Sequence, residues 1–138
     1  SRSADIPKSA DLLYLVTNRH EEESDVTVVT VTRLKDRWKT AEMRGKHIRA
    51  TIFSARGVLA VEELSEGRVR LVAAQSGATV GVCKGGQYGG VHEYLQYGFS
   101  PDGHTLGIVD TGMGASAPGL RLFDGLNGKV LWTTPIDG

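Results

Sequence analysis

Hydrophobic and polar residues alternate in many short segments of this chain. The segment VTVVTVT (26–32) has this pattern, and in RVRLVA (68–73) Val69 and Leu71 fall on one side of an extended chain, opposite two arginines. A period of two is that of a half-buried β-strand. No segment has an apolar stripe at helical spacing with capping residues at its ends. The sequence therefore predicts an all-β fold.

Turns rich in glycine separate these segments. Pro101-Asp102-Gly103 and Asn127-Gly128 are two of them. Asp-Gly and Asn-Gly tolerate the positive φ angles that tight hairpin turns demand. With the turns as boundaries we expect eleven strands: Leu12–Thr17, Val26–Thr32, Trp38–Met43, Ile48–Phe53, Val58–Glu63, Arg68–Ala73, Ala78–Cys83, His92–Phe99, Thr105–Asp110, Gly119–Asp124 and Lys129–Thr134.

Parts of the sequence resemble one another at a long spacing. FSARGVLAV (from 53) aligns with FSPDGHTLGIV, which begins 46 residues later at 99. VRLVAAQSGATV (from 69) aligns with LRLFDGLNGKVL, 51 residues later at 120, and more weakly with VTVTRLKDRWKTA, 40 residues earlier at 29. Repeats of about 40–45 residues with four strands each are typical of the blades of a β-propeller.

FSPDGHTL (99–106) and GLRLFDGLNGKVLW (119–132) together resemble the blade signature of WD40-like propellers. There an inner strand ends in Phe-Ser-Pro-Asp-Gly, and a later strand reads hydrophobic-Arg-Leu-Trp-Asp before a turn and Gly-Lys. The matching residues here are Phe99, Ser100, Pro101, Asp102, Gly103, Arg121, Leu122, Asp124, Gly128 and Lys129, with Phe123 in the place of the tryptophan. GKVLW (128–132) is also similar to quinoprotein-type repeats. The resemblance implies a propeller of four-stranded antiparallel blades.

The predicted strands divide into about three blades. Residues 1–9 are expected to be an N-terminal extension, and 10–138 to form blades at about 12–45, 46–90 and 91–138. The first blade would lack its innermost strand, because residues 1–9 do not read as one. Propellers close with 4–8 blades, so about three would be an incomplete ring with open edges. We expect another protein chain, or a second copy of this one, to complete the ring, with about six blades in a two-fold pair.

Composition limits the class of partner. The 138 residues contain 16 basic and 16 acidic side chains, so overall charge indicates no nucleic-acid partner, and the short apolar runs predict no membrane span. The single cysteine, Cys83, excludes an internal disulfide and reads as a buried thiol on a strand. Residues 1–9 have no apolar leader, which slightly favours the cytoplasm. The basic residues from 33 to 39 occupy alternate positions, as on the solvent-exposed face of strands and their turn.

Asp110 is the sharpest catalytic candidate. LGIVDTGM (106–113) resembles the pattern around the catalytic aspartate of aspartic proteases, which use two carboxylates, so a short chain of that family would have to dimerise. The aspartate region of subtilisin-like proteases is also similar, but the chain has neither a His-Gly-Thr-His nor a Gly-Thr-Ser stretch. The favoured interpretation is that Asp110 ends the second strand of the third blade.

The remaining candidates lie in loops. Lys84, Gln87, Tyr88 and Met113 could contact a ligand or partner, because binding residues are often on loops of a rigid scaffold. The four histidines have no metal-ligand spacing, so no metal site and no cofactor are expected.

The favoured function is a non-catalytic propeller segment that serves as an interaction scaffold or as a structural part of a larger assembly. One alternative is a segment of a propeller-containing enzyme, such as a quinoprotein-like dehydrogenase or a peptidase, with most catalytic residues on another chain. A weaker alternative is a dimeric aspartic protease that uses Asp110.

Overall fold

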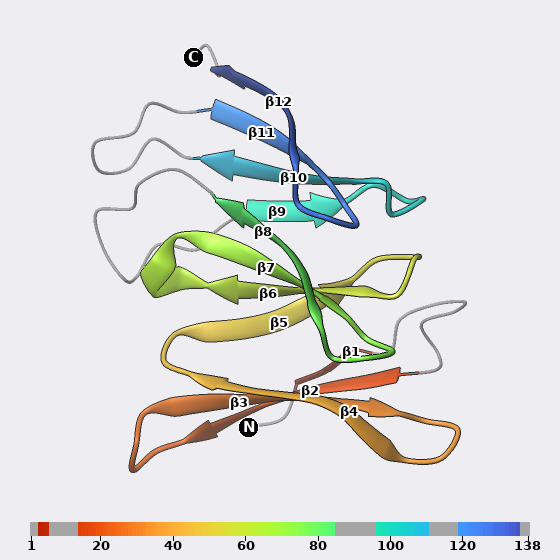
Figure 1. Ribbon diagram of the computed structural model, residues 1–138. Coiled ribbons are helices and arrows are strands. Elements are labelled where there is room, and N and C mark those ends of the chain that lie inside the picture. Colours follow the sequence, from red (N-terminus) through yellow and green to blue (C-terminus); the bar gives the residue numbers. More distant parts are fainter. Residues whose placement is uncertain (1–2, 6–13, 85–95, 111–118, 136–138) are drawn as a thin grey trace.

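The computed structural model describes residues 3–5, 14–84, 96–110 and 119–135, which form three four-stranded antiparallel sheets. The sheets are stacked face to face and none is closed (Figure 1). The first contains β1 (Ser3–Asp5), β2 (Tyr14–Glu21), β3 (Val26–Arg33) and β4 (Trp38–Gly45). The second contains β5 (Ile48–Phe53), β6 (Val58–Glu63), β7 (Arg68–Ala73) and β8 (Thr79–Lys84). The third contains β9 (Gln96–Phe99), β10 (Thr105–Asp110), β11 (Gly119–Asp124) and β12 (Val130–Pro135).

The all-β prediction is confirmed, and most strands lie where they were expected. The prediction of eleven strands is wrong, because Ser3–Asp5 forms the first strand of the first sheet and pairs with β2. Three residues leave no room for a hydrophobic pattern, so only backbone pairing marks this strand. A short 3-10 helix, η2 (Leu64–Glu66), links β6 to β7.

The inner strand β6 of the second sheet is buried on both faces. In β6, Val58, Leu59, Ala60 and Val61 are all at most 3% exposed. Because successive side chains in a strand point to opposite faces, Leu59 and Val61 pack towards the first sheet, and Val58 and Ala60 towards the third. This explains why VLAV reads as a continuous apolar run, whereas strands with one wet face alternate.

Two hydrophobic cores hold the sheets together. The core between the first and second sheets is centred on Val29, Val31, Leu59 and Val72. The core between the second and third sheets contains the buried residues Val58, Ala60, Val69, Leu71, Cys83, Leu106, Ile108 and Phe123. Apolar side chains from both neighbouring sheets therefore fill the space between the first and second sheets and between the second and third.

Polar contacts supplement these cores. The Asn18 side chain of β2 reaches the backbone of Ala50 in β5, donating to its carbonyl oxygen at 2.8 Å and accepting from its N–H at 2.9 Å. Glu62 is fully buried, and its carboxylate pairs with the Arg49 guanidinium at 3.2 Å. The first contact ties one sheet to the next, and the second places a compensated charge inside the second sheet.

The last hairpin turn of each sheet has the same chemistry. A side-chain oxygen accepts a hydrogen bond from the backbone N–H two residues later, in the pairs Asp36–Trp38 (3.2 Å), Ser76–Ala78 (3.2 Å) and Asn127–Lys129 (2.8 Å). The residue between them has a positive φ: Arg37 (59°), Gly77 (76°) and Gly128 (74°). The ladder that leads to the turn shifts register in all three sheets. The three turns are therefore built alike, although only two of them have glycine at the left-handed position.

The Phe-Ser turns of the second and third sheets also agree. The Ser54 hydroxyl accepts from the Val58 N–H at 3.1 Å, and the Ser100 hydroxyl accepts from the Thr105 N–H at 3.0 Å. Both turns continue into a glycine with positive φ, Gly57 or Gly103. The segments FSARG and FSPDG therefore fold in the same way.

Replacing Arg37 with glycine is expected to stabilise the protein by about 0.5–1 kcal/mol. Arg37 is exposed, and its φ of 59° costs a residue with a Cβ about 1–2 kcal/mol, which exceeds the entropy that glycine adds to the unfolded chain. Urea unfolding measured for Arg37→Gly and for Lys35→Gly in the same turn would check this. Lys35 has no positive φ, so its glycine variant should lose stability, and a loss in Arg37→Gly would contradict the prediction.

Candidate functional site

The sequence-predicted site residues do not gather into one described site. Lys84 is the last residue of β8 and is exposed. Gln87, Tyr88 and Met113 lie outside the described residues. Asp110 is the last residue of β10, and its backbone pairs with Gly119 of β11. It therefore ends the second strand of the third sheet, as the favoured interpretation held, while the next two residues of its Asp-Thr-Gly motif are not described.

No metal centre is found in the described part of the chain. Its His, Cys, Asp and Glu side chains form no group of three that could hold an ion. His20 and Asp25 make an exposed pair at 2.9 Å, and this hydrogen bond holds the pKa of Asp25 below its ordinary value. Among the same residues, no helix is long and apolar enough to cross a membrane.

Cys83 is a core residue, as the sequence predicted. It lies in the core between the second and third sheets and is fully buried. Burial, with a smaller contribution from the negative charge of Asp124, raises the pKa of its thiol to about 12. Because the thiolate is the reactive form, Cys83 is not an activated nucleophile.

We expect Cys83 to be protected from thiol reagents at pH 8. With a pKa of about 12, roughly one thiol in ten thousand is ionised at that pH, and the sulfur is inaccessible. An aromatic disulfide reagent should therefore react at least about a hundred times more slowly with the native protein than with the protein in urea. Equal rates under the two conditions would contradict the buried position.

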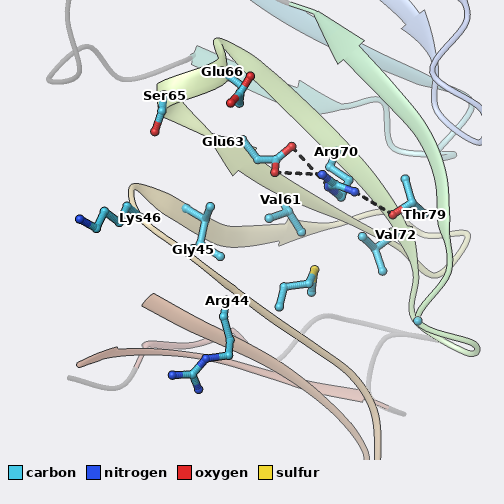
Figure 2. Close-up of a pocket in the computed structure, with 13 residues that line it drawn as sticks. Arg44, Gly45, Lys46, Val61, Glu63, Ser65, Glu66, Arg70, Val72 and Thr79 are labelled. Atoms are coloured by element: carbon cyan, nitrogen blue, oxygen red, sulfur yellow. Dashed lines mark hydrogen bonds and ion pairs between the residues drawn. The ribbon is translucent and has the colours of Figure 1, made fainter. Parts of the chain in front are cut away.

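The first of three candidate surfaces is a groove between the first and second sheets (Figure 2). It has a volume of about 450 Å³ and is lined by Met43 of the first sheet and by Ile48, Val61 and Val72 of the second. Its polar wall is an ion-pair network in which Glu63 binds Arg68 at 2.7 Å and Arg70 at 3.2 Å, and Arg70 also donates to Thr79 at 3.2 Å.

In this network the charge of Glu63 is compensated by the charges of Arg68 and Arg70. The Glu63 carboxylate already has two guanidinium partners, and Lys46 extends away from them in Figure 2. A charged ligand that bound at Glu63 or Arg70 would have to break these pairs, so this part of the groove is a weak candidate for ion recognition. The sequence placed the two arginines on the polar side of β7 correctly, but it gave no sign of their partner, because Glu63 lies on the neighbouring strand.

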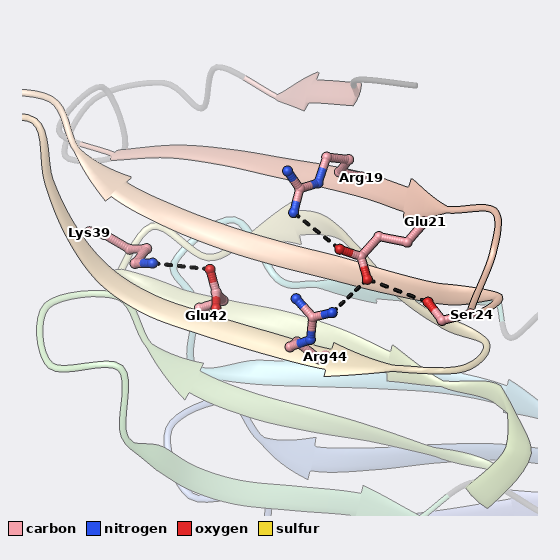
Figure 3. Close-up of polar contacts among 6 residues, drawn as sticks. All are labelled: Arg19, Glu21, Ser24, Lys39, Glu42 and Arg44. Carbon is pink, nitrogen blue, oxygen red and sulfur yellow. Dashed lines mark hydrogen bonds and ion pairs between the residues drawn. The ribbon is translucent and has the colours of Figure 1, made fainter.

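The second surface is the outer face of the first sheet (Figure 3). Glu21 of β2 pairs with Arg44 of β4 at 2.5 Å and with Arg19 at 3.5 Å, and Lys39 pairs with Glu42 at 3.0 Å. Lys39 and Arg44, two of the basic residues of the region 33–49, thus each have an acidic partner, which agrees with a solvent-exposed strand face. We call this surface, with the residues named here, the first-sheet face.

The third surface is the outer face of the third sheet. Cross-strand partners share a face, so β9 to β12 place Gly98, Gly107, Leu122 and Trp132 in one row. The next row contains Gln96, Val109 and Leu120. None of the residues named in these two rows has a charged side chain. We call these two rows the third-sheet face.

Part of the third-sheet face is open to solvent. The Trp132 side chain is 49% exposed, and its neighbours in β12, Val130 and Leu131, are 58% and 54% exposed. Three consecutive large apolar residues exposed on an edge strand are unusual, because such an edge favours association with another chain. The sequence analysis noted GKVLW (128–132) for its similarity to quinoprotein-type repeats, but it did not predict that this apolar run is exposed.

Comparison with known proteins does not assign this arrangement to a family. No model of a protein family matches the sequence, and no curated protein matches it significantly. The function is therefore argued from the geometry of the sheets.

Proposed function

We propose that this chain is a non-catalytic propeller segment that serves as an interaction scaffold or as a structural part of a larger assembly. The stacking of three consecutive four-stranded sheets supports the propeller part of this proposal. Further support comes from the positive-φ residues in the last hairpin turn of each sheet, Arg37, Gly77 and Gly128. The first two are 40 residues apart and the last two are 51 residues apart. These are the spacings at which the sequence segments align.

The single observation that carries the scaffold part is the third-sheet face. In this stack, apolar side chains fill the space between the first and second sheets and between the second and third. The third sheet presents Leu122 and Trp132 on its other side, and Trp132 is half exposed. Exposed apolar surface of this kind is typical of protein–protein contact sites.

The experiment is a comparison of native mass in a cell extract that contains the chain. We expect the wild-type chain to migrate in an assembly larger than its own 14.8 kDa, and Leu122→Glu to migrate as a single chain. Thr17→Glu on the opposite end of the stack is the control and should stay in the assembly. Migration of the wild type as a single chain would contradict the proposed function.

A further inference from the structure

The third-sheet face has an uneven relief that distinguishes it from the other sheets. Its central row reads Gly98, Gly107, Leu122 and Trp132 from β9 to β12, two residues without side chains followed by two large ones. Among the described residues, nothing lies within 4 Å of a Cβ built on Gly98. A Cβ on Gly107 would lie 3.4 Å from Cδ2 of Leu122, so the Leu122 side chain partly covers that glycine. The face is therefore open at Gly98 and raised at Leu122 and Trp132.

The second sheet has a different relief at the same positions. The row that corresponds in register is Ile52, Ala60, Leu71 and Gly81, so the outermost residue is the small one. The third sheet uses that space: a Cβ on Gly81 would lie 2.2 Å from the backbone oxygen of Asn127, in the turn between β11 and β12. A close turn over a small residue is thus part of how one sheet packs on the next here.

Trp132 prevents the third sheet from receiving a neighbour in this way. Trp132 pairs with Leu122 as Gly81 pairs with Leu71, so its indole occupies the place where such a neighbour would bring its turn. A further sheet packed like the third on the second would collide with it. The occupant of the third-sheet face must instead have a hollow opposite Trp132.

The first-sheet face of a second copy does not fit either. Head-to-tail pairing of two copies would press the Arg19–Glu21–Arg44 cluster against Leu122 and Trp132. The ion pairs would lose water without gaining a polar partner, which is unfavourable for each charge that is buried. Charge complementarity therefore disfavours closing a ring from two copies in this arrangement.

We propose that the third-sheet face binds the third-sheet face of a second copy, as a two-fold dimer, an inference that rests on the proposed scaffold function. A two-fold axis that runs along the strands, between β10 and β11, lays β12 of one copy over β9 of the other. Trp132 of each copy then stands over Gly98 of the other. The raised and open ends of the row are complementary under this operation, and none of the four residues of the row is charged.

The test is the mass of the purified chain as a function of concentration, measured by sedimentation equilibrium. We expect a reversible dimer of twice 14.8 kDa. Trp132→Gly, which removes the raised residue, and Gly98→Trp, which fills the hollow, should each raise the dimer dissociation constant at least about 30-fold, the effect of losing an interface hot spot. The double variant Gly98→Trp with Trp132→Gly exchanges the two features and should restore the dimer.

Controls separate misfolding and ring closure from the proposed contact. The circular dichroism spectrum of each variant shows whether it is folded, and Thr17→Glu, on the outer side of β2, should leave the dissociation constant unchanged. A purified wild type that stays monomeric would overturn the inference, and so would a dimer that Thr17→Glu weakens and Gly98→Trp does not. A folded double variant that remains monomeric would also overturn it.

The failure of this inference differs from a failure of the proposed function. If the purified chain is monomeric but migrates in a larger assembly in the extract, and Leu122→Glu removes it from that assembly, the partner is a different protein. The scaffold function would then stand without the two-fold dimer. A single chain under both conditions would remove both.

Discussion

Replacing Asn18 with alanine is expected to lower the free energy of unfolding by about 3 kcal/mol. The Asn18 amide donates to the Ala50 carbonyl at 2.8 Å and accepts from the Ala50 N–H at 2.9 Å. Ala50 is 1% exposed and lies on β5, the edge strand of the second sheet. Alanine at 18 would leave these two buried backbone groups without their side-chain partner, at a cost of about 1–3 kcal/mol each.

Urea unfolding followed by circular dichroism would measure this loss. Arg19→Ala is a matched control on the same strand, because its side chain is exposed and its ion pair with Glu21 is long, at 3.5 Å. We expect that control to change stability by less than about 0.5 kcal/mol. If Asn18→Ala is as stable as the control, the amide does not tie the first sheet to the second.

Replacing Gly81 with alanine is expected to cost about 3 kcal/mol. The added Cβ would lie 2.2 Å from the Asn127 oxygen and 2.7 Å from the Gly128 nitrogen, both backbone atoms of the turn in the third sheet. A flexible side chain could rotate away, but a backbone turn has to shift. Such a shift disturbs the packing of the third sheet on the second, so the cost falls at the upper end of the range for overpacking.

The glycine at 98 provides the control for this measurement. It also lies in a strand, but a Cβ there meets no described atom within 4 Å. Measured at protein concentrations at which the chain is monomeric, Gly98→Ala should therefore be neutral or stabilising by about 0.5 kcal/mol, because alanine reduces the entropy of the unfolded chain. Similar losses in Gly81→Ala and Gly98→Ala would show that the close turn has no special role.

Much of the fold could be predicted because local signals agree with it. For β6 and β7 the predicted bounds are those observed, since apolar residues fill both strands and glycine-containing turns end them. The Asn127-Gly128 turn has the positive φ that its residue types predict. Arg37 has the same backbone conformation without glycine, so that turn is set by its neighbours in the sheet and not by a local preference.

The contacts between strands and sheets could not be predicted from the sequence. Asn18 and Glu62 are polar residues in strand patterns, and nothing near them in the sequence identifies Ala50 or Arg49 as their partners. The arrangement of small and large residues on the third-sheet face could not be predicted for the same reason. Gly98, Gly107, Leu122 and Trp132 come together only when register is known, since they lie on four different strands.

The charged residues of the first-sheet face also limit how the protein can polymerise. A bare sheet at the end of a stack is a template on which further molecules could add without limit, as in fibres. Here Glu21, Arg44 and Lys39 would each have to be dehydrated before another molecule could settle on that end. The cost of dehydrating these charges thus opposes the addition of further molecules to the first-sheet face, and this disfavours aggregation through that end of the stack.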